Sequence, residues 1–133
     1  MPADNLASTC LRLRPDSSIE KLSLDGFWPR LMRGELGDFR HEYLVTSGAY
    51  SADWSNWEMH PNGDEIVCLL DGNATMVLAA TDGSRQEITL TEPGSFAFIP
   101  RGSWHTAKVA APSRFLFITA GEGTQHRSAG EMP

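Results

Sequence analysis

The sequence has no apolar run long enough to cross a membrane. No uninterrupted apolar stretch is longer than Met76 to Ala80, whereas a membrane-spanning helix needs roughly 20 such residues. The first nine residues contain no apolar run either, and the first basic residue is Arg12. We therefore expect neither a membrane partner nor a signal peptide.

Cysteine and basic residues are also scarce. Cys10 and Cys68 are far apart and match neither a CxxC redox motif nor a disulfide-rich scaffold, which favours a cytoplasmic protein with two ordinary thiols. Lysine and arginine number 11 against 17 aspartates and glutamates, a formal net charge of −6, and no run is rich in Lys and Arg. Because an acidic chain repels phosphate backbones, nucleic acid is not an expected partner.

Long helical patterns are missing as well, since no window of about 11 residues keeps an apolar period of 3.6. Instead, short runs rich in β-branched or aromatic residues are bounded by Gly, Pro, Asp or Asn. These runs cover residues 40–46, 54–60, 65–70, 74–80, 85–90, 95–99, 106–110 and 114–120. Asp71-Gly72 and Asp82-Gly83 are expected to form hairpin turns. The spacing indicates an all-β sandwich or barrel, and 133 residues predict a single domain.

The chain divides into three expected parts. Residues 1–40 are predicted to form N-terminal strands and loops, residues 41–120 the barrel, and residues 121–133 a polar tail that frays. The first part carries more apolar side chains than one small barrel easily buries, namely Leu22, Leu24, Phe27, Trp28, Leu31 and Met32. Two-fold dimers are the commonest oligomers, and sheet edges need cover. We therefore predict a homodimer in which residues 1–40 help to cover a neighbouring sheet.

Polar side chains gather on one face of the predicted strand 54–60. Residues two apart on a strand point the same way, and this face carries Trp54, Asn56, Glu58 and His60. Residues 61–64 are typical of a turn, and a tight reversal there would bring Glu65 back beside His60 on the neighbouring strand. A later turn leads into a strand through His105. Such a set is not an ordinary core face.

Both segments resemble the two sequence motifs of the cupin superfamily, small β-barrels of the jelly-roll type. The first motif is matched at the family's spacing by Glu58, His60, Glu65 and Gly72, with Glu58 where the first histidine usually stands. The second is matched by Gly94, Pro100, Gly102 and His105. Ala52 and Val109 replace the opening glycine and the closing asparagine. The resemblance covers residues 52–109 and implies a cupin-type jelly-roll fold, but one fold hosts many chemistries.

In cupins, the residues at the motif histidines and glutamate bind one divalent metal ion inside the barrel. The resemblance therefore implies Glu58, His60, Glu65 and His105 as the metal ligands of this chain. Imidazoles with carboxylates suit Zn, Fe, Mn, Ni or Cu, and no thiolate belongs to the set. The alternative is a metal-free barrel in which Glu58 forms a hydrogen-bonded acid pair with Glu65, and the polar residues bind a small ligand.

Other candidate residues surround this set. Trp54, Asn56 and Trp104 are expected to line a pocket. His41 can point inward or outward, and we expect it to be a satisfied or solvated histidine. His126 is expected to be a solvated residue of the tail, and the alternative is a tail that folds over the barrel mouth as a lid.

Two classes of function follow from these residues. The first is a metal-dependent enzyme acting on a small organic molecule, and the resemblance leaves dioxygenase, isomerase, decarboxylase and hydrolase types open. The second is a non-catalytic module that binds or senses a small ligand without metal. A lone barrel with no attached DNA-binding or signalling domain favours the enzyme. Metal analysis followed by an oxygen-uptake screen discriminates between the two.

Overall fold

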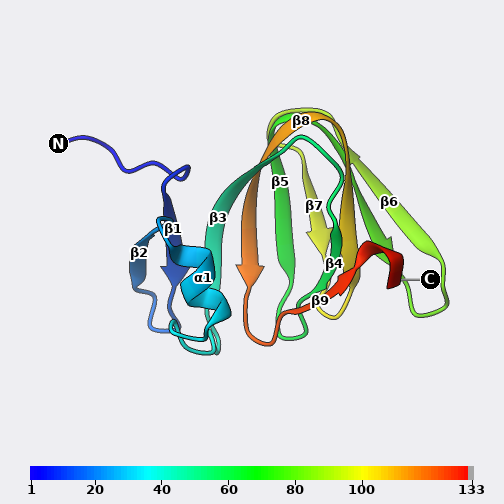
Figure 1. Ribbon diagram of the computed structural model, residues 1–133. Coiled ribbons are helices and arrows are strands. Elements are labelled where there is room, and N and C mark those ends of the chain that lie inside the picture. The colour runs from blue at the N-terminus through cyan, green and yellow to red at the C-terminus, as the bar shows by residue number, and fades with distance from the viewer. Residues whose placement is uncertain (132–133) are drawn as a thin grey trace.

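Two long strands, β5 (Glu65–Ala79) and β8 (Trp104–Ala120), pair antiparallel over most of their length and form the middle of the protein (Figure 1). The computed structural model describes residues 1–131. From Glu65 to Leu69 every second residue of β5 is buried, as expected of a strand with one face in a core. That core consists of Val67, Leu69, Ala74, Met76, Leu78, Leu90, Ala97, Ile99, Ala107 and Phe115.

The other strands flank this pair. They are β1 (Thr9–Leu13), β2 (Ile19–Ser23), β3 (Tyr43–Tyr50), β4 (Asn56–Met59), β6 (Arg85–Leu90), β7 (Phe96–Ile99) and β9 (Gln125–Ser128). The register between β5 and β8 shifts between Leu69 and Ala74, and the two halves of each long strand have different neighbours. One layer has the order β2-β1-β3-β8-β5-β7, and the other has the order β6-β5-β8-β4-β9. The predicted all-β sandwich is confirmed.

The middle of β5, where its register with β8 shifts, corrects the prediction made for Asp71-Gly72. Asp71-Gly72 is not a hairpin turn, because β5 continues through it and pairs with β8 on both sides. Gly72 has a φ of 113°, which favours glycine, and a Cβ there would collide with Pro112 and Ser113 of β8. Asp82-Gly83, in contrast, is the predicted hairpin turn, and it connects β5 to β6.

Residues 1–40 form an extension beside the sandwich. β1 pairs with both β2 and β3, and the short helix α1 (Phe27–Met32) lies beside them (Figure 1). No helix within residues 1–131 is long and apolar enough to span a bilayer. The extension has a core of its own, made of Cys10, Phe27, Leu36, Phe39 and Leu44, with Leu22, Leu24 and Leu31 packed against it. Only part of the predicted apolar surplus is therefore exposed, with Trp28 at 51% and Met32 at 75%.

The C-terminal segment corrects a second prediction. Instead of fraying, residues 125–128 form β9, which pairs antiparallel with β4. A 3₁₀ turn, η1 (Ala129–Glu131), follows. Two hydrogen bonds hold it, from the Ala129 amide to the Ser55 carbonyl (2.9 Å) and from the Trp57 indole to the Ala129 carbonyl (3.3 Å). Residues 132–133 of the predicted tail lie outside the described residues.

Candidate metal centre

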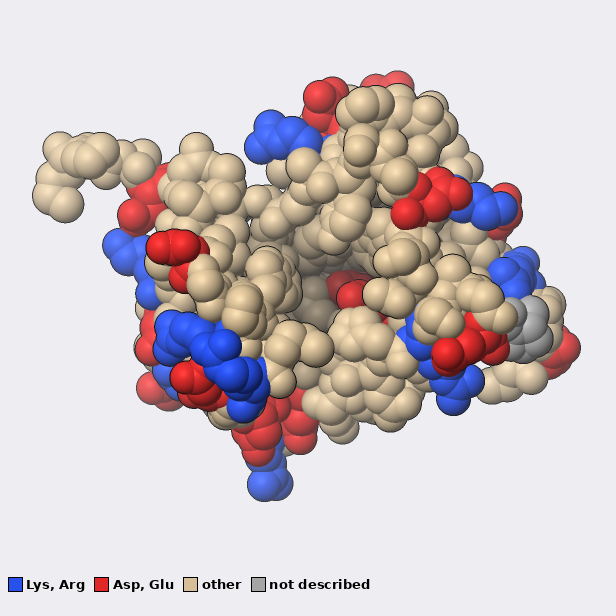
Figure 2. All heavy atoms as spheres, viewed as in Figure 1, with Lys and Arg blue, Asp and Glu red and all other residues tan. Residues whose placement is uncertain are grey.

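The structure brings together the four residues singled out from the sequence. Glu58 lies on β4 and His60 follows it, Glu65 begins β5, and His105 is the second residue of β8. The rings of His60 and His105 have centroids 5.3 Å apart. Ligand atoms of Glu58, His60 and His105 all lie within 4.8 Å of one another. Figure 2 shows a hollow in the viewed face with acidic atoms inside it.

The approach of Glu65 to the histidines differs in one respect from the prediction. β4 and β5 do not pair with each other in the described part of the chain, and both instead pair with β8. The Glu65 side chain nevertheless reaches both histidines, with Oε1 2.9 Å from His105 Nε2 and 3.4 Å from His60 Nε2. Glu58 Oε2 lies further out, 3.8 Å from His60 Nε2 and 4.0 Å from His105 Nε2. Ligands on metal bonds of about 2.1 Å lie roughly 3 Å apart, so Glu58 needs the larger adjustment to join a common ion.

In His60, His105 and Glu65, the polar atoms that face away from the centre already have hydrogen-bond partners. Thr124 Oγ1 contacts His60 Nδ1 at 2.9 Å, the Ser103 carbonyl contacts His105 Nδ1 at 3.0 Å, and Thr119 Oγ1 donates to Glu65 Oε2 at 2.7 Å. A histidine that donates from Nδ1 presents the lone pair of Nε2.

The atoms that face the centre have no such partner. His60 Nε2, His105 Nε2 and Glu65 Oε1 are buried without an assigned hydrogen-bond partner, and the last two lie 2.9 Å apart. Buried polar groups are nearly always satisfied, so exceptions need a cause. Three convergent acceptors with no donor between them favour either a metal ion or a proton at this position. The donor set therefore fits a divalent metal ion held by two imidazoles and a carboxylate.

The pKa values of Glu65 and His105 are shifted by the attraction between the carboxylate and the imidazole. Burial by itself raises the pKa of Glu65, but the adjacent imidazoles of His105 and His60 outweigh it and lower that pKa from 4.5 to about 2. For His105, burial lowers the pKa and the Glu65 carboxylate raises it, with a net rise above 6.5. Without metal, a proton on His105 supplies the positive charge that Glu65 attracts.

An aromatic wall continues from the candidate centre into the sandwich. The Trp54 ring lies 6.5 Å from the His105 ring, and Tyr50, Phe115 and Phe117 have ring centroids 5.5 to 6.5 Å from it. Burial, followed by the charges of Glu58 and Glu65, raises the pKa of Tyr50. The Trp54 indole N–H is buried without a hydrogen-bond partner. This wall combines apolar surface with one free donor.

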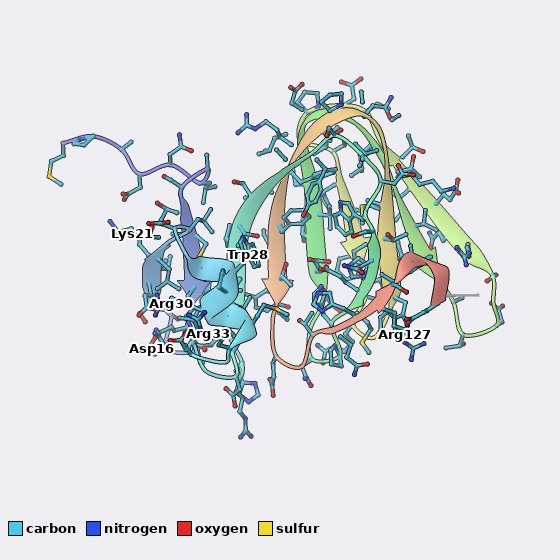
Figure 3. All side chains as sticks on the ribbon, viewed as in Figure 1. Asp16, Lys21, Trp28, Arg30, Arg33 and Arg127 are labelled. Atoms are coloured by element: carbon cyan, nitrogen blue, oxygen red, sulfur yellow. The ribbon has the colours of Figure 1, made fainter. Side chains whose placement is uncertain are left out.

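The remaining sequence candidates lie elsewhere. Asn56 is exposed at the start of β4. Trp104 precedes His105 on β8 and points to the opposite face, where the Arg127 guanidinium covers its ring at 4.6 Å, so its predicted pocket-lining role is wrong. Figure 3 shows Arg127 far from the labelled residues of the N-terminal extension. His41 is exposed in a turn before β3 and takes no part in the centre.

Two residues of the C-terminal segment contact the candidate ligands. Sequence reasoning missed Thr124, and it considered His126 only through the alternative of a tail that folds over the barrel mouth. Thr124 contacts His60, as described above, and His126 Nε2 lies 3.1 Å from Glu58 Oε1. His126 is still 45% exposed, but this contact and the pairing of β9 with β4 hold it beside Glu58. No pattern in the tail announces these contacts. They depend on the pairing of β9 with β4, which joins distant parts of the chain.

Fold and site together define a β-sandwich with a candidate metal centre between its two layers. No protein-family model matches the sequence, and no curated protein matches it either. Solved structures do match. Bacillus subtilis oxalate decarboxylase, described with Mn(II) centres, is 21% identical with a TM-score of 0.52 over 66% of this chain. This chain covers 23% of that protein.

A second match is hydroquinone 1,2-dioxygenase from a Sphingomonas species with 4-hydroxybenzoate bound. It is 20% identical with a TM-score of 0.50, and the match covers 58% of this chain and 59% of the dioxygenase. A cupin-2 domain protein from Shewanella frigidimarina is 23% identical with a TM-score of 0.47, and here the match covers 58% of this chain and 69% of the other. Matches at identities this low show the fold alone. The chain has the β-sandwich fold that is seen in oxalate decarboxylase and in hydroquinone 1,2-dioxygenase.

Proposed function

We propose that this chain is a divalent-metal-dependent enzyme that acts on a small organic molecule. The observation that carries the proposal is the convergence of three buried acceptors, His60 Nε2, His105 Nε2 and Glu65 Oε1, with no donor between them. Glu58 Oε2 is the proposed fourth ligand. Cupin-fold enzymes such as the decarboxylase and the dioxygenase support this class of function, but neither defines the substrate.

The donor set narrows the choice of metal. Two imidazole nitrogens and two carboxylate oxygens, without thiolate, suit Zn, Fe, Mn, Ni or Cu. When bound, the ion supplies Lewis acidity and, with a redox-active metal, a site for oxygen chemistry. The two carboxylates offset its charge and keep the filled centre close to neutral.

The residues around the centre indicate what the substrate looks like. The wall of Tyr50, Trp54, Phe115 and Phe117 offers apolar contact to a bound molecule. The unpaired indole N–H of Trp54 can donate to one polar atom of the substrate. We therefore propose a small molecule with an apolar part and a hydrogen-bond acceptor, in a dioxygenase, isomerase or hydrolase type of reaction.

Elemental analysis of untagged protein tests the proposal directly. Growth in medium supplemented with Zn, Fe, Mn, Ni and Cu salts should yield close to one ion per chain of one of these metals. The purified protein is then screened for oxygen uptake with small aromatic and aliphatic substrates. Negligible metal after supplementation would overturn the metal-dependent enzyme.

That negative result would favour the second candidate, a metal-free module that binds a small ligand. One observation supports it: the Glu65 carboxylate and the His105 imidazole are only 2.9 Å apart and can hold each other as a buried ion pair. In this case the aromatic wall and the polar cluster would form the ligand site.

Metal affinity is expected to fall as the pH falls, and the loss should begin above pH 6.5. The reason is that the Glu65 carboxylate raises the pKa of His105 above its ordinary value of 6.5, so the proton competes with the metal earlier. Glu65, with a pKa of about 2, stays ionised throughout this range. Below the His105 pKa the affinity should drop about tenfold per pH unit for one displaced proton. Metal titrations between pH 5 and pH 9 measure this, and a flat profile would contradict it.

We also propose that the chain forms a homodimer, in which residues 1–40 help to cover a neighbouring sheet. Trp28 and Met32 on α1 are exposed, and so are Phe96 and Phe98 of β7, 59% and 51%. Exposed aromatic pairs of this kind are typical of interfaces. Light scattering is expected to give twice the 14.6 kDa chain mass at micromolar concentration. Phe98→Ser should shift the equilibrium towards monomer, whereas a monomeric wild type would refute the proposal.

A further inference from the structure

The C-terminal segment Gly121–Ser128 runs alongside the candidate centre. β9 lies next to β4 (Figure 1), and Glu58 is directly opposite His126 in the register. Both ends of the segment are anchored by other contacts. Asn62 Nδ2 donates to the Glu122 carbonyl at 3.1 Å, and the Ala129 amide donates to the Ser55 carbonyl at 2.9 Å. The placement of the segment therefore does not depend on the side chains of Thr124 and His126.

Thr124 determines which nitrogen of His60 carries the proton. The Thr124 hydroxyl donates its only hydrogen to the Gly121 carbonyl at 3.0 Å. With that hydrogen on the Gly121 carbonyl, Thr124 Oγ1 is left as the acceptor at its 2.9 Å contact with His60 Nδ1, an arrangement that places the imidazole hydrogen on Nδ1. Neutral His60 is thereby fixed with its Nε2 lone pair towards Glu65 and Glu58.

His126 acts on Glu58 in a comparable way. An ionised carboxylate only accepts hydrogen bonds, so His126 Nε2 donates to Glu58 Oε1 across 3.1 Å. This contact occupies one carboxylate oxygen and directs the other, Oε2, towards the two histidines. The Glu58 side chain is 31% exposed, and among the residues described it makes no other side-chain hydrogen bond.

We infer that the segment Gly121–Ser128 orients two ligands of the proposed metal centre. Thr124 is the positioning residue for His60, and His126 is the positioning residue for Glu58. The inference rests on the metal-binding function proposed above. Partners of metal ligands fix the orientation and the tautomer of those ligands, and their loss typically weakens metal binding about 10- to 100-fold. The C-terminal strand thus contributes to affinity without supplying a ligand itself.

Paired variants separate a positioning role from a structural one. Thr124→Val keeps the shape and loses the hydroxyl, and Thr124→Ser restores it. His126→Ala loses the donor, and His126→Gln returns an N–H at the same number of bonds from the backbone. Gln125→Ala is the matched control, since Gln125 is exposed on β9 and lies opposite Met59, which is not a candidate ligand.

The probe is Co²⁺, whose affinity is measured by chelator competition and whose ligand field is read from its visible absorption. We expect Thr124→Val and His126→Ala to weaken Co²⁺ binding about 10- to 100-fold and to change the absorption band. Thr124→Ser, His126→Gln and Gln125→Ala should resemble the wild type. In the metal-free protein, ¹⁵N spectra should show His60 protonated at Nδ1 in the wild type and a mixture of tautomers in Thr124→Val.

A double-variant cycle tests whether His126 acts through Glu58. If it does, His126→Ala should have little further effect on Co²⁺ affinity once Glu58→Ala is present. Fully additive losses would overturn the positioning role of His126. A wild type that binds Co²⁺, combined with unchanged Thr124→Val and His126→Ala variants, would overturn the inference and leave the proposed function standing. A wild type that binds no Co²⁺ would overturn both.

Discussion

His105→Ala is expected to reduce the metal bound per chain at least tenfold, a loss of about 1.4 kcal/mol or more in binding free energy. His105 is fully buried, and its Nε2 is one of the three acceptors that converge without a donor. Alanine removes a nitrogen ligand and leaves Glu65 without its closest partner, 2.9 Å away. Elemental analysis of the variant and of the wild type, purified in parallel, measures the loss.

The chain offers a matched control for this variant. His41→Ala removes an exposed histidine from a turn and should leave the metal content unchanged. Glu58→Gln should weaken binding less than His105→Ala, since an amide oxygen can still coordinate although the charge is lost. Equal metal content in His105→Ala and the wild type would show that His105 is not a ligand.

Gly72→Ala is expected to destabilise the fold by about 2–5 kcal/mol. The left-handed backbone costs an alanine roughly 1–2 kcal/mol. The collision of its Cβ with Pro112 and Ser113 adds about 1–3 kcal/mol of overpacking. Small domains hold only about 5–15 kcal/mol in total, so thermal unfolding should shift down by roughly 10 °C.

Gly83→Ala is the control that separates the cost of the left-handed backbone conformation from the cost of the Cβ collision. Gly83 also has a positive φ, 85°, but a Cβ there meets nothing within 4 Å. Its variant should therefore lose only the backbone contribution, roughly 1–2 kcal/mol. Unfolding followed by circular dichroism compares the two, and equal losses would show that the close approach of β5 to β8 at Gly72 is not rigid.

The two Asp-Gly pairs show one hairpin turn that the local sequence predicts correctly and one that it predicts wrongly. Asp71-Gly72 and Asp82-Gly83 carry the same turn dipeptide, and locally both favour a hairpin. Only the second forms one. At the first, β5 stays paired with β8 on both sides, and this long-range pairing overrides the local preference. A single sequence contains no measure of such pairing.

The candidate centre was predictable to the extent that spacing alone defines it. His60, Glu65 and His105 follow the motif spacing, and period-2 alternation places Glu58 on the same face as His60. The same alternation, applied to β8, would have placed Trp104 opposite His105. The roles of Thr124 and His126 were not predictable, because they depend on where the C-terminal strand docks.

The docking of the C-terminal strand determines when the candidate centre is completed during folding. His126 meets Glu58 across 68 residues of sequence, and Thr119 meets Glu65 across 54. Contacts between such distant parts require large loops to close before any contact energy is gained, which makes folding slow. During synthesis, a chain that has emerged only as far as Gly123 still lacks the partners of Glu58 and His60. Full-affinity metal uptake should therefore lag behind barrel formation, and its rate would report the final docking event of a newly made molecule.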